Sequence, residues 1–169
     1  MNISSHIKTT SSPESIEMIA SFLENHVEGV ITTINEEGIP QASVINVSVK
    51  QNFETFFVTE RQTTKYKNLQ NNHNVVFVSY DSFSRAEVEI EGVAYEVSDE
   101  QVRADEKAKV EEAIQLHKRH TPPYKSIHSA EHPVFVIFPK RIHMVTYLKD
   151  AAETQAFHET IEFNLPSTF

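Results

Sequence analysis

Hydrophobic positions along most of this chain alternate with polar ones, which is the pattern of β-strands with one buried face. The pattern predicts strands over residues 29–35, 41–50, 53–59, 74–80, 86–97, 133–139 and 141–148, with a last strand around 156–163. In the segment VEIEGVAYEV, Val88 and Ile90 share one face, but Val93 and Tyr95 fall on the other. We therefore expect a β-bulge or a sharp bend at Gly92.

Three segments instead show helical spacing or helix-capping residues. Ser12 and Pro13 are typical of a helix start, and Ile16, Ile19, Ala20 and Leu23 follow at helical spacing, which predicts a helix over residues 13–26. A short helix is predicted over residues 63–72, and another from a capping box at 98–101 to about residue 119.

The order of these elements indicates the fold class. The first three strands form a meander, with a turn at residues 36–40 and Gly38 at its tip. Strands dominate, the links are short, and no repeat or linker is present. We predict an α+β protein, mainly antiparallel, with one β-barrel domain spanning residues 1–169 and flanking helices. Residues 1–11 are polar, and we expect them to be frayed.

The composition of the chain excludes several classes of binding and catalytic site. The formal net charge of −9 argues against general nucleic-acid binding and against docking on anionic membranes. The absence of cysteine excludes thiol catalysis and zinc–cysteine sites, and with no apolar run near the roughly 20 residues of a membrane span, we expect a cytoplasmic protein. The three glycines are isolated, so a glycine-rich phosphate loop is excluded.

The segment TERQTTKYKNLQNN, residues 59–72, stands out against this acidic background. Three threonines and three basic residues fall within its first nine positions, with the single acid Glu60. Hydroxyl groups and cations together bind phosphate, and the predicted helix start adds free N–H groups. A solvated loop with ordinary surface charges explains the composition as well.

The surroundings of this segment are similar to a known family. FFVTERQTTKYKNLQNNHNVVFV resembles the FMN-binding split barrels of the pyridoxamine phosphate oxidase-like superfamily, in which a lysine follows the strand-ending threonine by six residues, as Lys65 follows Thr59. Asn68 and Leu69 follow in the same register. GVITTINEEGIPQASVINVSV resembles the family's first hairpin, and VEIEGVAYEV its bulged strand. The resemblance covers about residues 13–148 and implies a split β-barrel.

The resemblance also implies a homodimer with FMN in a cleft between the subunits. The flavin ring would lie along Ser43, Val44, Ile45 and Asn46, and the ribityl chain beside Val58 and Thr59. Thr63, Thr64 and Lys65 would hold the phosphate, helped by Arg61. Glu87 stands where relatives often place a neutral or basic flavin contact, which leaves its role open.

Other residue clusters have ordinary explanations. His117, His120, His128 and His132 have no carboxylate at ligand spacing, so we interpret them as surface and helix-end residues rather than a metal site. Glu87, Glu89 and Glu91 are expected to form a solvated outer strand face. Tyr124, with Lys118, Arg119 and Lys125 around it, borders either a substrate pocket or an exposed basic loop.

The functional hypothesis that follows is an FMN-dependent oxidoreductase, with hydride transfer at the flavin and an unidentified small-molecule substrate. The chain resembles the small general-stress-type members rather than a true pyridoxamine phosphate oxidase, because it has no tryptophan and lacks the substrate-phosphate segment. The alternatives are a haem-binding or haem-handling protein, with His120, His143 or His158 as axial ligand, and a non-catalytic flavin carrier or sensor.

Overall fold

A computed structural model describes residues 12–97, 132–149 and 154–162 of the chain. The elements, in chain order, are α1 (Pro13–Asn25), β1 (Glu28–Ile34), β2 (Pro40–Val49), β3 (Thr55–Val58), α2 (Thr64–Asn71), β4 (Asn74–Asp81), β5 (Ala86–Glu96), β6 (Val134–Lys149) and β7 (Thr154–Glu162). The predicted helix after residue 98 and the end expected to be frayed, residues 1–11, lie outside the described residues.

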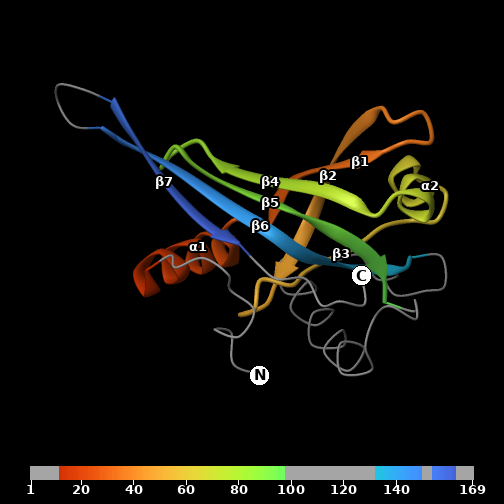
Figure 1. The fold of residues 1–169 in the computed structure, drawn as a ribbon, viewed down its shortest axis with the longest axis horizontal. Coiled ribbons are helices and arrows are strands. Elements are labelled where there is room, and N and C mark those ends of the chain that lie inside the picture. Colours follow the sequence, from red (N-terminus) through yellow and green to blue (C-terminus); the bar gives the residue numbers. More distant parts are fainter. Residues whose placement is uncertain (1–11, 98–131, 150–153, 163–169) are drawn as a thin grey trace.

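The strands form one antiparallel sheet in the order β3-β2-β1-β4-β5-β6-β7 (Figure 1). A further pairing between β3 and β6 joins the two sides of the sheet and closes a six-stranded barrel. The predicted fold class, a mainly antiparallel split barrel with helices attached, is confirmed.

Strand β6 was expected as two strands, and that prediction was wrong. Its first residues pair with β3, from Val134 to Ile137, whereas its second half pairs with β7, from Arg141 onward. Strand β5 pairs with both halves and keeps them in one continuous strand. The barrel is split because β6 exchanges one neighbour for another part-way along its length.

The irregularity predicted at Gly92 is present, but the extra residue lies on β6. Glu91 pairs with Arg141 and Gly92 with Pro139, so Lys140 has no partner on β5. A Cβ atom on Gly92 would lie 2.4 Å from the carbonyl oxygen of Phe138. Glycine is therefore needed here because the two backbones approach more closely than a side chain allows.

The change of hydrophobic phase in β5 has a different cause from the one expected. Ala94 stays on the same face as Ile90 and packs in the main core, so the strand does not switch faces. Val93 and Tyr95 are buried on the opposite face, in a second cluster with Phe56, Val136 and Phe138. Both faces of this half of β5 are covered, which sequence periodicity cannot distinguish from a reversal of phase.

Helix α1 supplies one wall of the main core. Ser12 caps it, accepting a hydrogen bond from the Ser15 N–H at 3.2 Å, and Pro13 occupies the first turn. Ile19, Phe22 and Leu23 are buried with residues of the barrel interior. Burial of each such side chain contributes about 1.5–3 kcal/mol, which favours the helix over a free chain.

Strand β3 is shorter than the predicted 53–59 because Phe53 belongs to the preceding turn. Its φ of 64° is in the left-handed region, and its N–H bonds the carbonyl of Lys50 at 2.8 Å. The ring of Phe53 is fully buried in the main core, which offsets the strain of this conformation. Within the described residues, neither helix is long and apolar enough to cross a membrane.

We predict that Gly92→Ala destabilises the protein by about 1–3 kcal/mol, because the added methyl group overlaps the Phe138 carbonyl. Equilibrium denaturation measures the change. Gly38→Asn is the matched control, since a Cβ at Gly38 meets no atom within 4 Å and asparagine tolerates its φ of +79°. Equal stability of the Gly92→Ala variant and the wild type would contradict the close approach.

Candidate functional site

The loop between β3 and α2 contains the predicted phosphate-binding residues. The chain leaves β3 at Thr59, whose N–H bonds the carbonyl of Pro133 at 3.3 Å. It then turns, with the Thr63 N–H bonded to the carbonyl of Glu60 at 3.1 Å. Thr63 caps α2 through the Tyr66 N–H, at 3.3 Å from its Oγ1. The short helix predicted over 63–72 is confirmed, with a capping residue at each end.

The hydroxyl groups of Thr59 and Thr63 stabilise the loop itself. Thr63 Oγ1 donates to the Glu60 carbonyl at 2.7 Å and lies 2.9 Å from Thr59 Oγ1. Because the Thr63 hydroxyl donates its hydrogen to the Glu60 carbonyl, the Thr59 hydroxyl must be the donor in its hydrogen bond with Thr63. Both threonines thus stabilise the shape of the loop, whereas Thr64 is exposed.

The start of α2 presents unpaired donors. Among the described residues, no acceptor bonds the backbone N–H of Thr64 or Lys65, as the geometry of a helix start requires. The Lys65 ammonium is half-buried, and no described carboxylate forms an ion pair with it. Burial lowers the pKa of Lys65, while the charge of nearby Glu60 opposes that effect. This arrangement is suited to an anion, which would offset the cost of burying the ammonium.

Two residues of α2 position Lys65 against the barrel. The Asn68 side chain donates to Thr33 Oγ1 at 3.0 Å and to Gln41 Oε1 at 2.9 Å, which ties the helix to the β1–β2 hairpin. Leu69 is fully buried in the main core. Lys65 precedes these residues by three and four positions, so it lies on the same helix face. The buried face of α2 therefore determines where the ammonium points.

Arg61 makes an ion pair that the sequence did not reveal. Its Nη2 lies 2.7 Å from Oε1 of Glu96, at the end of β5, and its guanidinium also contacts the Tyr66 hydroxyl. Glu96 is buried, and the bonded carboxylate raises the pKa of Arg61. Arg61 holds the loop against β5, and a role toward a phosphate would need this pair to open. Glu96 is 35 residues distant in sequence, with no motif to connect them.

The residues predicted along the flavin ring lie on β2, adjacent to β3. Val47 pairs with Phe57, so one residue further the register sets Asn46 level with Val58. Ile45 is buried, Ser43, Asn46 and Val58 are half-buried, and Val44 is exposed. The fold thus brings the two predicted groups, on β2 and on the β3–α2 loop, to neighbouring strands.

The outer carboxylates are partly neutralised by a cation from β6. Arg141 forms ion pairs with Glu89 and Glu91, and the carboxylates raise its pKa. Glu87, whose role was open, lies on the same face and is half-exposed. Within the described ranges there is no cluster of three or more potential metal ligands. His132 lies 3.8 Å from Glu60, but His117, His120, His128 and the cluster around Tyr124 lie outside the described residues.

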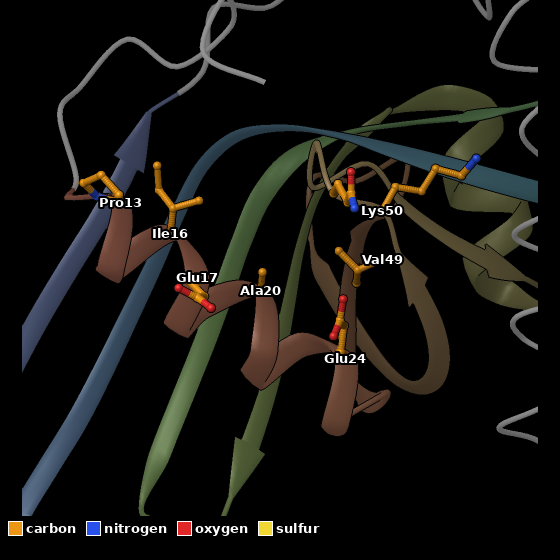
Figure 2. Close-up of a pocket in the computed structure, with 8 residues that line it drawn as sticks. Pro13, Ile16, Glu17, Ala20, Glu24, Val49 and Lys50 are labelled. Carbon is orange, nitrogen blue, oxygen red and sulfur yellow. The ribbon is translucent and has the colours of Figure 1, made fainter. Parts of the chain in front are cut away.

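A separate pocket of about 180 Å³ lies between α1 and the end of β2. Figure 2 shows Ile16 and Ala20 of α1 on one side and Val49 and Lys50 on the other. None of the residues predicted to bind a cofactor lines it. It is smaller than the 300–1,000 Å³ common for cofactor sites, so we do not assign the flavin to it.

Comparison with known proteins decides the family. Residues 16–146 match the family model described as pyridoxamine 5'-phosphate oxidase. The chain belongs to the pyridoxamine 5'-phosphate oxidase family. The predicted resemblance to this family is confirmed, and the matched region contains the β3–α2 loop and the β2 segment. No curated protein sequence matches the chain.

Several solved structures share the fold of this chain at low sequence identity. A presumed pyridoxamine 5'-phosphate oxidase from Listeria innocua aligns with a TM-score of 0.57 and 23% identity, over 75% of this chain and 94% of its own. General stress protein 26 from Bacillus anthracis aligns with a TM-score of 0.56 and 19% identity, over 76% of this chain and 92% of its own. A heme binding protein from Mycobacterium smegmatis aligns with a TM-score of 0.60 and 16% identity. The alignment covers 88% of this chain but only 59% of that protein.

We predict that Asn68→Ala destabilises the protein by about 1–3 kcal/mol, because it removes two hydrogen bonds, one buried and one half-buried, that hold α2 to the hairpin. Thermal unfolding measures the loss. Asn71→Ala is the matched control, since its amide bonds Glu36 at the exposed surface. An Asn68→Ala variant as stable as the Asn71→Ala variant would show that these two hydrogen bonds do not hold α2 to the hairpin.

Proposed function

We propose that this protein is an FMN-binding flavoprotein of the pyridoxamine 5'-phosphate oxidase family, and that it acts as an oxidoreductase. The observation that carries the proposal is the half-buried Lys65 ammonium, unpaired among the described residues, beside the free N–H groups at the start of α2. A buried cation is costly unless an anion accompanies it, and the family's cofactor ends in a phosphate.

The residues present fit this cofactor. Lys65, with the N–H groups and hydroxyl of Thr64, would bind the phosphate, while Thr63 and Thr59 hold the loop in shape, Thr59 beside the ribityl chain. Arg61 would assist only on leaving Glu96. Val58 would flank the ribityl chain, and the flavin ring would lie along the β2 residues Ser43, Val44, Ile45 and Asn46.

The chemistry of such a protein comes from the flavin, which accepts or donates a hydride when bound. The chain's own residues contribute position and electrostatics. Lys65 would supply a positive charge, and the apolar side chains of β2 and β3 would exclude water from one side of the flavin ring.

We further propose a homodimer that uses the outer face of β1, β2 and β4. Val30 is 40% exposed and pairs directly with Val44, which is 72% exposed, and with Val78 on β4. Tyr80, 57% exposed, continues this face. We call Val30, Val44, Val78 and Tyr80 the outer strip. Exposed apolar side chains on adjacent strands are typical of an interface, and a second copy would cover both the strip and the flavin.

We predict that Lys65→Glu abolishes FMN binding, because it places a carboxylate where the phosphate would lie. Titration of FMN fluorescence measures the affinity. Lys67→Glu is the matched control: it makes the same change of charge two residues further on the same helix, at an exposed position. Circular dichroism verifies that both variants fold.

Two results would contradict the flavin assignment. One is wild-type affinity in the Lys65→Glu variant, which would place the phosphate elsewhere. The other is a folded wild-type protein that takes up haem but not FMN, which would favour the haem-binding alternative. Absorbance spectra separate the two cofactors, because haem shows a Soret band and FMN shows flavin bands.

For the dimer, we predict that Val44→Asp produces monomers and weakens FMN binding, because it introduces a charge into the outer strip. Light scattering after size-exclusion chromatography measures the mass. Ile39→Asp is the matched control, since Ile39 is 53% exposed in the β1–β2 turn and outside the strip. A Val44→Asp variant that remains dimeric would exclude the strip as the interface.

A further inference from the structure

Two histidines on adjacent strands form a pair on the outer face of the sheet. His143 lies on β6 and His158 on β7, which runs alongside the second half of β6 (Figure 1). Nε2 of His143 is 3.2 Å from Nδ1 of His158, and the ring centroids are 5.3 Å apart with the planes inclined by 26°. His158 is exposed and His143 is half-buried.

Thr160 determines which nitrogen of His143 is available. Nδ1 of His143 lies 2.9 Å from Thr160 Oγ1. When Nδ1 carries the proton and donates it to that oxygen, Nε2 has a free lone pair directed toward His158. A histidine that binds a metal ordinarily donates its other ring N–H in this way, because the second hydrogen bond orients the ring and sets the tautomer.

The separation of the two nitrogens suits a tetrahedral metal ion. With Zn–N bonds of 2.0–2.1 Å, two imidazole nitrogens of a tetrahedral site are about 3.3 Å apart. The observed 3.2 Å is close to that value. At present one proton joins the two nitrogens, and a cation could take its place if His158 shifts its proton to Nε2. The exposed ring of His158 can rotate to direct its lone pair at the ion.

The charges around the pair favour a cation. Glu89 lies opposite His143 on β5, and Glu87 lies opposite Val145, the β6 partner of His158. Arg141 neutralises Glu89 in part through the ion pair at 3.3 Å, whereas no described cation pairs with Glu87. The chain as a whole carries a net charge of −9, which attracts cations to its surface.

We propose that His143 and His158 bind a divalent transition-metal ion, Zn²⁺ by geometry, with water completing its coordination. Imidazole is a preferred ligand of Zn²⁺ and its neighbours in the first transition row. The ion would join β6 to β7 and stabilise the pairing of the last strand, because it binds the folded chain and has no preformed site in the unfolded one. This site is independent of the proposed flavin site on β2, β3 and α2.

The test is calorimetric titration of the full chain, without an affinity tag, with Zn²⁺ alone. We expect one equivalent to bind and to raise Tm, and His143→Gln or His158→Gln to weaken binding at least about tenfold. The double change His117→Gln with His120→Gln serves as the control, because it removes two other histidines that lie three residues apart in the sequence. Unfolding in the presence of a chelator verifies that all variants fold alike.

Three outcomes would overturn the proposal: no Zn²⁺ binding by the wild type, unchanged binding in the His158→Gln variant, or loss of binding only in the His117/His120 variant. Co²⁺ in place of Zn²⁺ adds a spectroscopic readout, since a tetrahedral site produces intense visible absorption and an octahedral one does not. A wild-type Co²⁺ spectrum of octahedral type would contradict the two-histidine geometry even if binding were found.

Discussion

The close contact between the backbones of β5 and β6 is the constraint on which this barrel depends. At Gly92 the two strands approach so closely that a Cβ would lie 2.4 Å from the Phe138 carbonyl, and the register shifts by one residue at Lys140. On one side of this point β6 pairs with β3 and closes the barrel, and on the other side it pairs with β7. The change of pairing partner along β6 therefore coincides with the bulge at Lys140.

Closure of the barrel in turn positions the candidate site. Pairing of β3 with β6 brings Pro133 beside Thr59, where the chain leaves the barrel to form the loop. The loop leads into α2, which is held against the barrel by the hydrogen bonds of Asn68 and by the burial of Leu69. The Arg61–Glu96 ion pair holds the loop against β5. Lys65 therefore points to a fixed place with its charge half-buried. Such support suits the proposed cofactor site, because an ammonium on a mobile loop would lose affinity to entropy.

Two arginines of this acidic chain are paired with carboxylates of β5. Arg141 binds two of the three carboxylates on the outer face of β5, and Arg61 binds the buried Glu96 at its end. Within the described residues Lys65 forms no ion pair with a carboxylate, although it is half-buried. Of the three basic residues in the segment 59–72, Lys65 is therefore the strongest indication of a bound anion. The number of basic residues in the segment is a weaker indication.

The sequence by itself determined the meander, the N-cap of α1, the position of α2 and the family, because these depend on local spacing and on residues close together in the chain. Lys65 and its threonines could be predicted as a phosphate site for the same reason, because they lie close together in the chain. The tertiary structure alone decided that β6 is one strand, that both faces of β5 are covered beyond Gly92, that Glu96 holds Arg61, and that His143 meets His158. Each of these depends on contacts between residues far apart in sequence, and periodicity reports only that a face is buried, never what buries it.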